Sequence, residues 1–173
     1  MPLLVTAVMV YYIAHNLIVH YNDCMTNKPN PMLQLDNQLC FALYSTSLAM
    51  TKLYKPMLEE LGLTYPQYLA MLVLWERDGL MVSELGERLY LDSGTLTPLL
   101  KRLEASGYIS RIRAVDDERR VHISLTQTGR KLKARAAKIP VCILSASQCS
   151  VPELMTLTSQ VQALRQRLTA QQL

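Results

Sequence analysis

The sequence predicts a mainly α-helical protein with a small β wing, folded as a winged helix-turn-helix. Two short helical segments, 83–89 and 93–106, follow each other across a brief turn. Two alternating segments, 108–113 and 120–125, come next and have the period of paired strands. Two helices followed by a ribbon with basic strands is the element order of a DNA-binding winged helix. These four segments therefore predict both the fold class and a DNA partner.

Composition and charge agree with that partner. The 173 residues suffice for one domain with its own core, and half of them are hydrophobic. The net charge is only +4, but from Lys101 to Lys138 there are eleven Lys or Arg residues against four acidic ones. Such a basic block indicates nucleic acid before membrane. The sequence has no Gly-rich phosphate loop, GxSxG elbow or HExxH motif, so we expect neither an enzyme nor a cofactor.

The cysteines and histidines predict no metal site. Four cysteines lack CxxC spacing and three histidines are scattered. A chain this poor in cysteine is expected in the reducing cytoplasm, where a disulfide is transient and regulatory. The cysteines are Cys24, Cys40, Cys142 and Cys149.

The first 31 residues are predicted to be an extension outside the domain. Residues 1–21 are apolar but carry no Lys or Arg, so they lack the charged start of a signal peptide and are marginal for a membrane span. A weak anchor and an extra dimer-packing helix are possible interpretations. We favour translated upstream sequence ahead of a start at Met25 or Met32, and we expect no membrane role.

The domain itself is predicted to span residues 32–173, with dimerisation helices at both ends and a DNA-binding lobe at about 64–126. Apolar residues at helical spacing predict a long helix over 35–61 that ends at Gly62, with a kink or break before Pro56. Thr64 then caps a helix that extends to about Asp78.

The recognition helix is predicted to begin after Asp92 or Ser93 as N-cap and to end at Gly107. Its buried side is expected to hold Leu96, Leu99, Leu100 and Leu103. Small hydroxyl residues in its first turn, followed by basic residues, suit base edges and then phosphates. The residues expected to face DNA are Ser93, Thr95, Thr97, Pro98, Lys101 and Arg102.

The loop between the two predicted strands carries Asp117 and Arg119. An Arg at a hairpin tip can enter the minor groove, where negative potential is focused, and a neighbouring carboxylate can fix its direction. Plain solvation of these charges is the alternative.

After the wing, the sequence predicts a basic helix over 126–138 that ends before Pro140, then a looser stretch. A final helix over 151–168 carries an apolar stripe that this small chain has little left to cover. We expect that stripe and the first long helix to form a homodimer, which fits a palindromic operator. The stripe consists of Leu154, Leu157, Val161, Leu164 and Leu168.

Cys40 lies in an otherwise apolar helical stretch, and we predict a buried thiol there. Free cysteines in such places commonly pack as small hydrophobic residues. A thiolate is also the nucleophile that attacks a peroxide bond and becomes a sulfenic acid. Cys40 is therefore either a packing residue or a redox switch.

Three motifs closely resemble the organic-hydroperoxide-sensing repressors of the MarR family: residues 35–41 (LDNQLCF), 63–68 (LTYPQY) and 89–102 (LYLDSGTLTPLLKR). The wing-loop triplet at 117–119 (DER) does so too, and the resemblance runs from about Met32 to the C-terminus. It implies a dimeric winged-helix repressor of an organic hydroperoxide resistance gene, in which the hydroperoxide oxidises Cys40.

The same resemblance implies roles for individual residues. Tyr54 and Tyr65 of the other subunit hydrogen-bond the Cys40 thiolate. The six recognition-helix residues named above meet the major groove, and Arg119, oriented by Asp117, enters the minor groove. In the family's two-cysteine subgroup, a C-terminal cysteine of the opposite subunit resolves the sulfenic acid.

In this chain the position of that resolving cysteine falls near Ser145, with Cys142 and Cys149 on either side. Either can be the resolving thiol, and otherwise a small cellular thiol takes that role. Two other functions compete with the peroxide-sensing repressor. One is a regulator released by a small aromatic ligand, with Cys40 only structural. The other is a thiol peroxidase.

Overall fold

The computed structural model describes residues 30–113 and 121–171. The extension predicted for residues 1–31, apart from its last two residues, lies outside these ranges, as do Asp117 and Arg119 of the wing loop. The chain divides into two compact units, Met1–Leu48 and Ala49–Leu173, and each is described by itself.

In the first unit, two 3₁₀ turns, η2 (Pro31–Leu33) and η3 (Leu35–Asn37), precede helix α2 (Leu39–Glu59). The predicted helix start at residue 35 is therefore wrong by four residues. The side-chain amide of Asn37 donates to the Pro31 carbonyl at 2.8 Å, and that of Gln38 donates to the Met32 carbonyl at 2.5 Å. Such local side-chain bonds compete with an α-helical turn.

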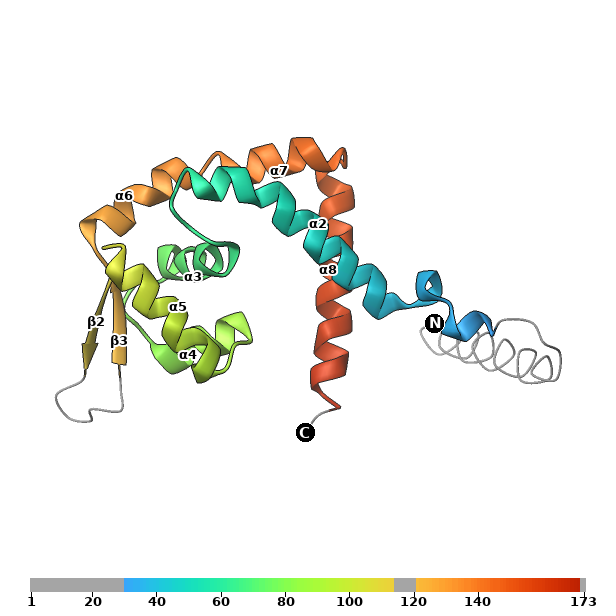
Figure 1. Cartoon of the computed structure of the whole chain (residues 1–173), viewed down its shortest axis with the longest axis horizontal. Coiled ribbons are helices and arrows are strands. Elements are labelled where there is room, and N and C mark those ends of the chain that lie inside the picture. The colour runs from blue at the N-terminus through green and yellow to red at the C-terminus, as the bar shows by residue number, and fades with distance from the viewer. Residues whose placement is uncertain (1–29, 114–120, 172–173) are drawn as a thin grey trace, which may run out of the picture. The chain divides into compact units, whose positions relative to one another are not determined.

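The second unit contains the end of α2, followed by α3 (Tyr65–Glu76), α4 (Val82–Leu89) and α5 (Ser93–Ala105) (Figure 1). α2 runs on through Pro56, so of the predicted kink or break, the break is wrong. Pro56 lies in the last turn, where its missing N–H leaves a single carbonyl without its helical donor. Gly62 follows with φ +66°, the left-handed conformation expected of a residue that ends a helix.

Among the described residues, the sheet has three antiparallel strands rather than the two predicted. β2 (Ile109–Arg113) and β3 (Val121–Leu125) form the wing, with Ile109 opposite Leu125. The additional strand, β1 (Leu80–Met81), pairs with β3 on its other side, so the order is β1-β3-β2. Two residues are too few for an alternating pattern, which is why the sequence did not reveal β1.

The core of the second unit lies between α5, α3, α4 and the sheet. All four leucines predicted for the inner side of α5 are buried, and so are Met71, Leu74, Leu85 and Ile123. Each fully buried side chain of this size contributes about 1.5–3 kcal/mol relative to exposure. This packing fixes the rotation of α5 about its axis and directs the opposite side outward.

Three more helices follow the wing: α6 (Gln127–Ala136), α7 (Ile139–Ser147) and α8 (Val151–Thr169). The looser stretch predicted after Pro140 is wrong, because it is helix α7. Pro140 stands in the first turn of α7, where a helix needs no N–H donor.

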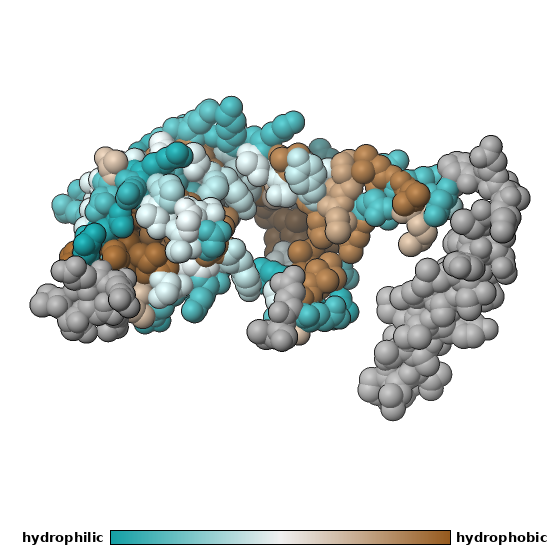
Figure 2. Space-filling view, turned by 60° about the horizontal axis from the view of Figure 1, so that its bottom comes forward, coloured by the Kyte–Doolittle hydropathy of each residue, from teal (hydrophilic) through white to brown (hydrophobic). Residues whose placement is uncertain are grey.

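α8 has an exposed apolar side in the single chain, part of which is visible as brown surface in Figure 2. Its exposed residues are Met155 (67%), Leu157 (52%), Val161 (47%) and Leu168 (54%), whereas Leu154 and Leu164 are half-buried. Within the described ranges, no helix combines the length and apolarity needed to cross a bilayer.

Candidate DNA interface and redox site

The recognition helix α5 begins with Asp92 as its N-cap, the first of the two residues predicted. The Asp92 carboxylate accepts hydrogen bonds from the Thr95 backbone N–H at 2.8 Å and from the Thr95 hydroxyl at 3.0 Å. These bonds to Thr95 stabilise the charged form and hold the pKa of Asp92 below its usual value. The cap therefore fixes the first turn, and the Thr95 hydroxyl is part of it.

The predicted DNA-facing residues share the outer side of α5. Five of them are exposed and Thr97 is half-buried, opposite the buried leucines. Ser93 and Thr95 lie in the first turn, and Lys101 and Arg102 lie two turns later. The helix therefore offers hydroxyl groups at its start and positive charge further along, in the order that base and phosphate contacts need.

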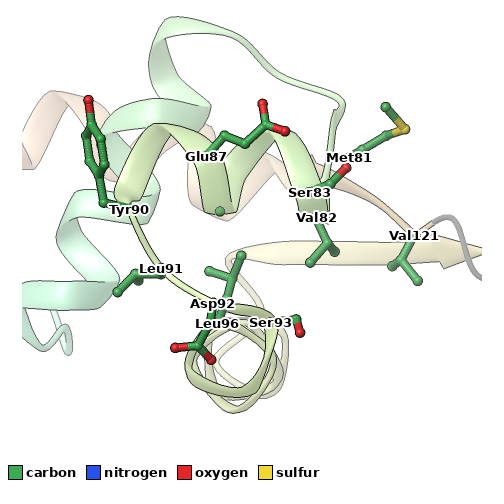
Figure 3. A pocket seen from close by; sticks show the side chains of 11 residues that line it. Met81, Val82, Ser83, Glu87, Tyr90, Leu91, Asp92, Ser93, Leu96 and Val121 are labelled. Carbon is green, nitrogen blue, oxygen red and sulfur yellow. The ribbon is translucent and has the colours of Figure 1, made fainter. Parts of the chain in front are cut away.

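A hollow of about 660 Å³ lies beside the start of α5, between α4 and β3 (Figure 3). Tyr90 lines it and connects α4 to α5 in a left-handed conformation with φ 55°. The guanidinium of Arg165 in α8 lies over the Tyr90 ring, 4.4 Å from its centroid. This cation–π contact joins the turn of the helix-turn-helix to the C-terminal helix. Other lining residues are Val82, Ser83, Glu87, Leu96 and Val121.

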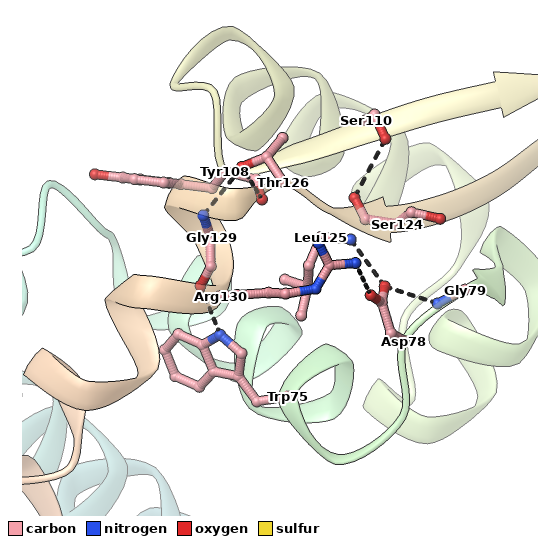
Figure 4. A network of polar contacts seen from close by, with 10 residues as sticks. All are labelled: Trp75, Asp78, Gly79, Tyr108, Ser110, Ser124, Leu125, Thr126, Gly129 and Arg130. Carbon is pink, nitrogen blue, oxygen red and sulfur yellow. Dashed lines mark hydrogen bonds and ion pairs between the residues drawn. The ribbon is translucent and has the colours of Figure 1, made fainter.

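The base of the wing is fastened to the end of α5 and the start of α6 (Figure 4). The Thr126 hydroxyl donates to the Gly107 carbonyl at 2.6 Å and accepts from the Gly129 N–H at 3.0 Å. A side chain at position 129 would collide with the Tyr108 carbonyl, so only glycine fits there. The two wing strands therefore leave the domain from a fixed base.

Cys40 is the second residue of α2 and is exposed in the single chain. The predicted burial of its thiol is therefore wrong for one copy of the chain. Its neighbours Leu39, Leu43 and Tyr44 are exposed as well. The thiol thus belongs to an apolar surface that the chain leaves open.

Tyr54 and Tyr65 lie in contact, with ring centroids 4.9 Å apart. Tyr68 joins them at 6.0 Å from Tyr54, a neighbour that the sequence analysis missed. Burial raises the pKa of all three phenols, and the neighbouring Tyr65 adds to the effect at Tyr54 and Tyr68. The phenols therefore stay protonated and able to donate. The spacing of three residues between Tyr65 and Tyr68 on one helix was the available signal.

The two C-terminal thiols differ in their surroundings. Cys142 lies in α7 and is exposed. Cys149 is half-buried in the turn between α7 and α8, where its thiol donates to the Ser147 carbonyl at 3.4 Å. In the part of the chain that the structure describes, no three His, Cys, Asp or Glu side chains cluster as metal ligands would.

A second cavity of about 270 Å³ lies between α3 and the junction of α6 with α7. Tyr68, Leu72 and Trp75 form its α3 side, and Ala136, Ala137 and Pro140 form the other. Of the described residues that line it, Glu76 and Lys133 are the charged ones. The cavity therefore suits an apolar group of about the size of one ring.

Comparison with known proteins agrees with the geometry. The family model "Transcriptional regulator SarA/Rot" matches residues 52–136. The organic hydroperoxide resistance transcriptional regulator of Bacillus subtilis is 54% identical over 83% of this chain and 97% of its own length. The regulator TtmR of Methylorubrum extorquens is 47% identical over 84% of this chain and 74% of its own.

Among solved structures, AbfR of Staphylococcus epidermidis in its reduced, DNA-bound form is 35% identical, with a TM-score of 0.66 over 78% of this chain and 93% of that one. AbfR has also been solved with a disulfide formed. These likenesses and the arrangement of α4, α5 and the wing confirm the predicted fold class. The chain belongs to the MarR family of winged helix-turn-helix transcriptional regulators, and within it to the organic-hydroperoxide-regulator type.

Proposed function

We propose that this protein is a redox-sensing repressor that binds a palindromic operator as a cytoplasmic homodimer and is released when an organic hydroperoxide oxidises Cys40. The observation that carries the proposal is the contact between Tyr54 and Tyr65, which brings two protonated phenols together. Paired phenol donors are what a thiolate on a second copy needs for stabilisation. The Bacillus subtilis relative regulates organic hydroperoxide resistance, which supports the same inducer.

The chemistry balances in two steps. The Cys40 thiolate attacks the terminal oxygen of the hydroperoxide, the O–O bond breaks, and an alkoxide leaves and takes up a proton to become the alcohol. Cys40 is then a sulfenic acid. A second thiol condenses with it, which forms a disulfide and releases water.

The exposed apolar surfaces support the homodimer. Leu39, Leu43 and Leu48 are open on the first part of α2, and Leu157 and Val161 are open on α8. Exposed apolar areas of this kind usually mark an interface. In the dimer, Tyr54 and Tyr65 of one subunit donate hydrogen bonds to the Cys40 thiolate of the other.

DNA contacts are assigned to the outer side of α5, with Ser93, Thr95, Thr97 and Pro98 at base edges and Lys101 and Arg102 at phosphates. Their shared exposure on one side of the helix supports this assignment. Arg119, oriented by Asp117, extends the contact into the minor groove.

Of the two candidate resolving thiols, the structure favours Cys142. Its exposure lets it approach a sulfenic acid on the partner subunit. Cys149 must first give up its hydrogen bond to the Ser147 carbonyl.

The test is operator binding by Cys40→Ser before and after treatment with cumene hydroperoxide. We expect the variant to bind as the wild type does and to stay bound after oxidation, while wild type is released. Cys149→Ser is the matched control, because it keeps both the sensing thiol and the favoured resolving thiol and should still be released. Release of Cys40→Ser by the hydroperoxide would refute the proposal.

The 270 Å³ cavity favours one second candidate, a regulator released by a small aromatic ligand. In that case a phenolic acid, without any oxidant, should lift both wild type and Cys40→Ser from the operator. Leu72→Trp, which fills the cavity, should abolish that response and leave the response to hydroperoxide intact.

A further inference from the structure

Helix α3 carries two different groups of side chains at its two ends. Its first turn holds Tyr65 and Tyr68, which contact Tyr54. Its last turn holds Trp75, which contacts α6, and the residues that follow hold Asp78, which contacts both β3 and α6. Since α3 is a continuous helix of 12 residues, the two groups are held at a fixed separation.

Trp75 bonds to the start of α6. Its indole Nε1 donates to the Gly129 carbonyl at 2.9 Å, and its own carbonyl accepts from Lys133 Nζ at 3.0 Å. The Tyr68 ring meets the Trp75 ring edge-on, with centroids 6.3 Å apart. The indole therefore links the tyrosine group to the segment that follows the wing.

Asp78 bonds to the wing itself (Figure 4). One carboxylate oxygen accepts from the backbone N–H groups of Leu125 and Gly79, each at 2.8 Å. The other oxygen accepts from the Arg130 guanidinium at 2.7 Å. Leu125 is the last residue of β3, and Arg130 lies in the first turn of α6. One carboxylate thus fastens the end of the central strand and the start of the next helix to α3.

We propose that Asp78, supported by Trp75, is a positioning residue for DNA recognition: it sets the direction in which the wing leaves the domain. The proposal rests on the proposed function in one respect, that the wing tip contacts DNA. Asp78 acts through Leu125 and Arg130 and touches no DNA itself. Its loss therefore changes the placement of the wing and leaves α5 in the major groove.

Salt dependence separates this role from a general loss of stability. The logarithm of the affinity falls linearly with the logarithm of the salt concentration. Each cationic contact to DNA adds about 0.9 to the magnitude of this slope. A misplaced wing removes such a contact and makes the slope less steep. A variant that is only less stable reduces the fraction of active protein and keeps the slope.

The experiment compares Asp78→Asn with Glu76→Gln on a palindromic duplex that wild type selects from a random pool. Both changes remove one carboxylate from the same end of α3, but Glu76 pairs with Arg88 of α4 and not with the wing. Asp78→Asn should weaken binding about ten-fold, the scale of one charge-assisted hydrogen bond, and lower the salt slope by about one. Glu76→Gln should change neither quantity.

A double-mutant cycle with Arg119→Ala completes the test. If Asp78 acts through the wing tip, adding Asp78→Asn to Arg119→Ala should cause little further loss of DNA affinity. Full additivity, or an unchanged slope in Asp78→Asn, overturns the proposal. Trp75→Phe is the second variant, for use if Asp78→Asn does not fold. It keeps an aromatic ring and removes the N–H donor, so it should also weaken binding and make the salt slope less steep. If Arg119→Ala binds with wild-type affinity, the wing does not contact DNA, and that part of the proposed function fails. Release by hydroperoxide is a separate test of the redox sensor.

Discussion

The hydroxyl of Tyr108 donates a hydrogen bond to the main-chain carbonyl oxygen of Leu61 across 2.8 Å. Tyr108 follows the recognition helix, and Leu61 follows α2, so this bond joins the ends of two helices that are 47 positions apart. Glu60, just after α2, is held as well: Arg135 of α6 donates to its carbonyl at 2.6 Å, and Lys138, the N-cap of α7, donates to its carboxylate at 2.8 Å. These bonds connect the residues that follow α2 to the residue that follows the recognition helix and to the junction of α6 with α7.

Tyr108→Phe removes this bond and keeps the ring. We expect the free energy of unfolding to fall by about 1 kcal/mol, because the carbonyl of the buried Leu61 loses its donor. Urea denaturation followed by circular dichroism measures the change. Tyr90→Phe, at an exposed ring, is the control and should stay near wild type; equal losses in both variants would contradict the role of the Tyr108 hydroxyl.

Gly129→Ala should be among the most damaging small substitutions in the chain. The added methyl group meets the Tyr108 carbonyl, so either the base of the wing or the start of α6 must move. Overpacking of this kind costs about 1–3 kcal/mol or more. Thermal unfolding measures the loss, and Thr128→Ala, at the exposed neighbouring position, should melt close to wild type.

Asp92→Ala should weaken both stability and operator binding, because the first turn of α5 loses its cap. We expect the melting temperature to fall by about 2–4 °C, the usual scale for a lost cap in a chain of this size. Asp92→Asn keeps an acceptor oxygen for the Thr95 N–H and should recover most of the loss. The idea fails if alanine and asparagine variants melt alike.

Acid should loosen the base of the wing through Asp78. Burial opposes ionisation of this carboxyl, but bonds from the Leu125 N–H, Arg130 and the Gly79 N–H outweigh it and hold the pKa of Asp78 below 3.8. The stabilisation is therefore complete above about pH 3.8 and is lost as the pH falls through the lower folded-state pKa. The difference in melting temperature between wild type and Asp78→Asn should be constant near neutral pH and shrink in that acid range. A difference that persists unchanged below it would contradict this cause.

The DNA-reading elements could be predicted from the sequence because their signals are local. The cap at Asp92, the leucine period of α5 and the stop at Gly107 all lie within one short segment. Helix α7 was missed although its signal is also local, because that signal has two meanings. Proline at position 140 suits the end of the preceding helix and equally suits the first turn of the next one.

The rest of the site depends on contacts between distant positions. Trp75 and Gly129 are 54 residues apart, and Asp78 and Arg130 are 52 residues apart. No periodicity or motif connects such pairs, so these hydrogen bonds at the base of the wing could not be predicted from the sequence. The exposure of Cys40 was missed because an apolar helix side is buried only where another surface covers it, and the sequence pattern does not say whether that surface belongs to the same chain.

The strand order β1-β3-β2 leaves β2 as an edge strand, paired with β3 alone among the described residues. An open strand edge invites pairing with the edge of another molecule, which is a route to aggregation. β2 carries the exposed Arg113, whereas Arg111 is half-buried and pairs with Glu104 at 3.7 Å. Positive charge on an edge strand is one way in which natural proteins protect such edges. The charge of Arg113 therefore repels the same edge of a second copy, which protects β2 from sheet-to-sheet association.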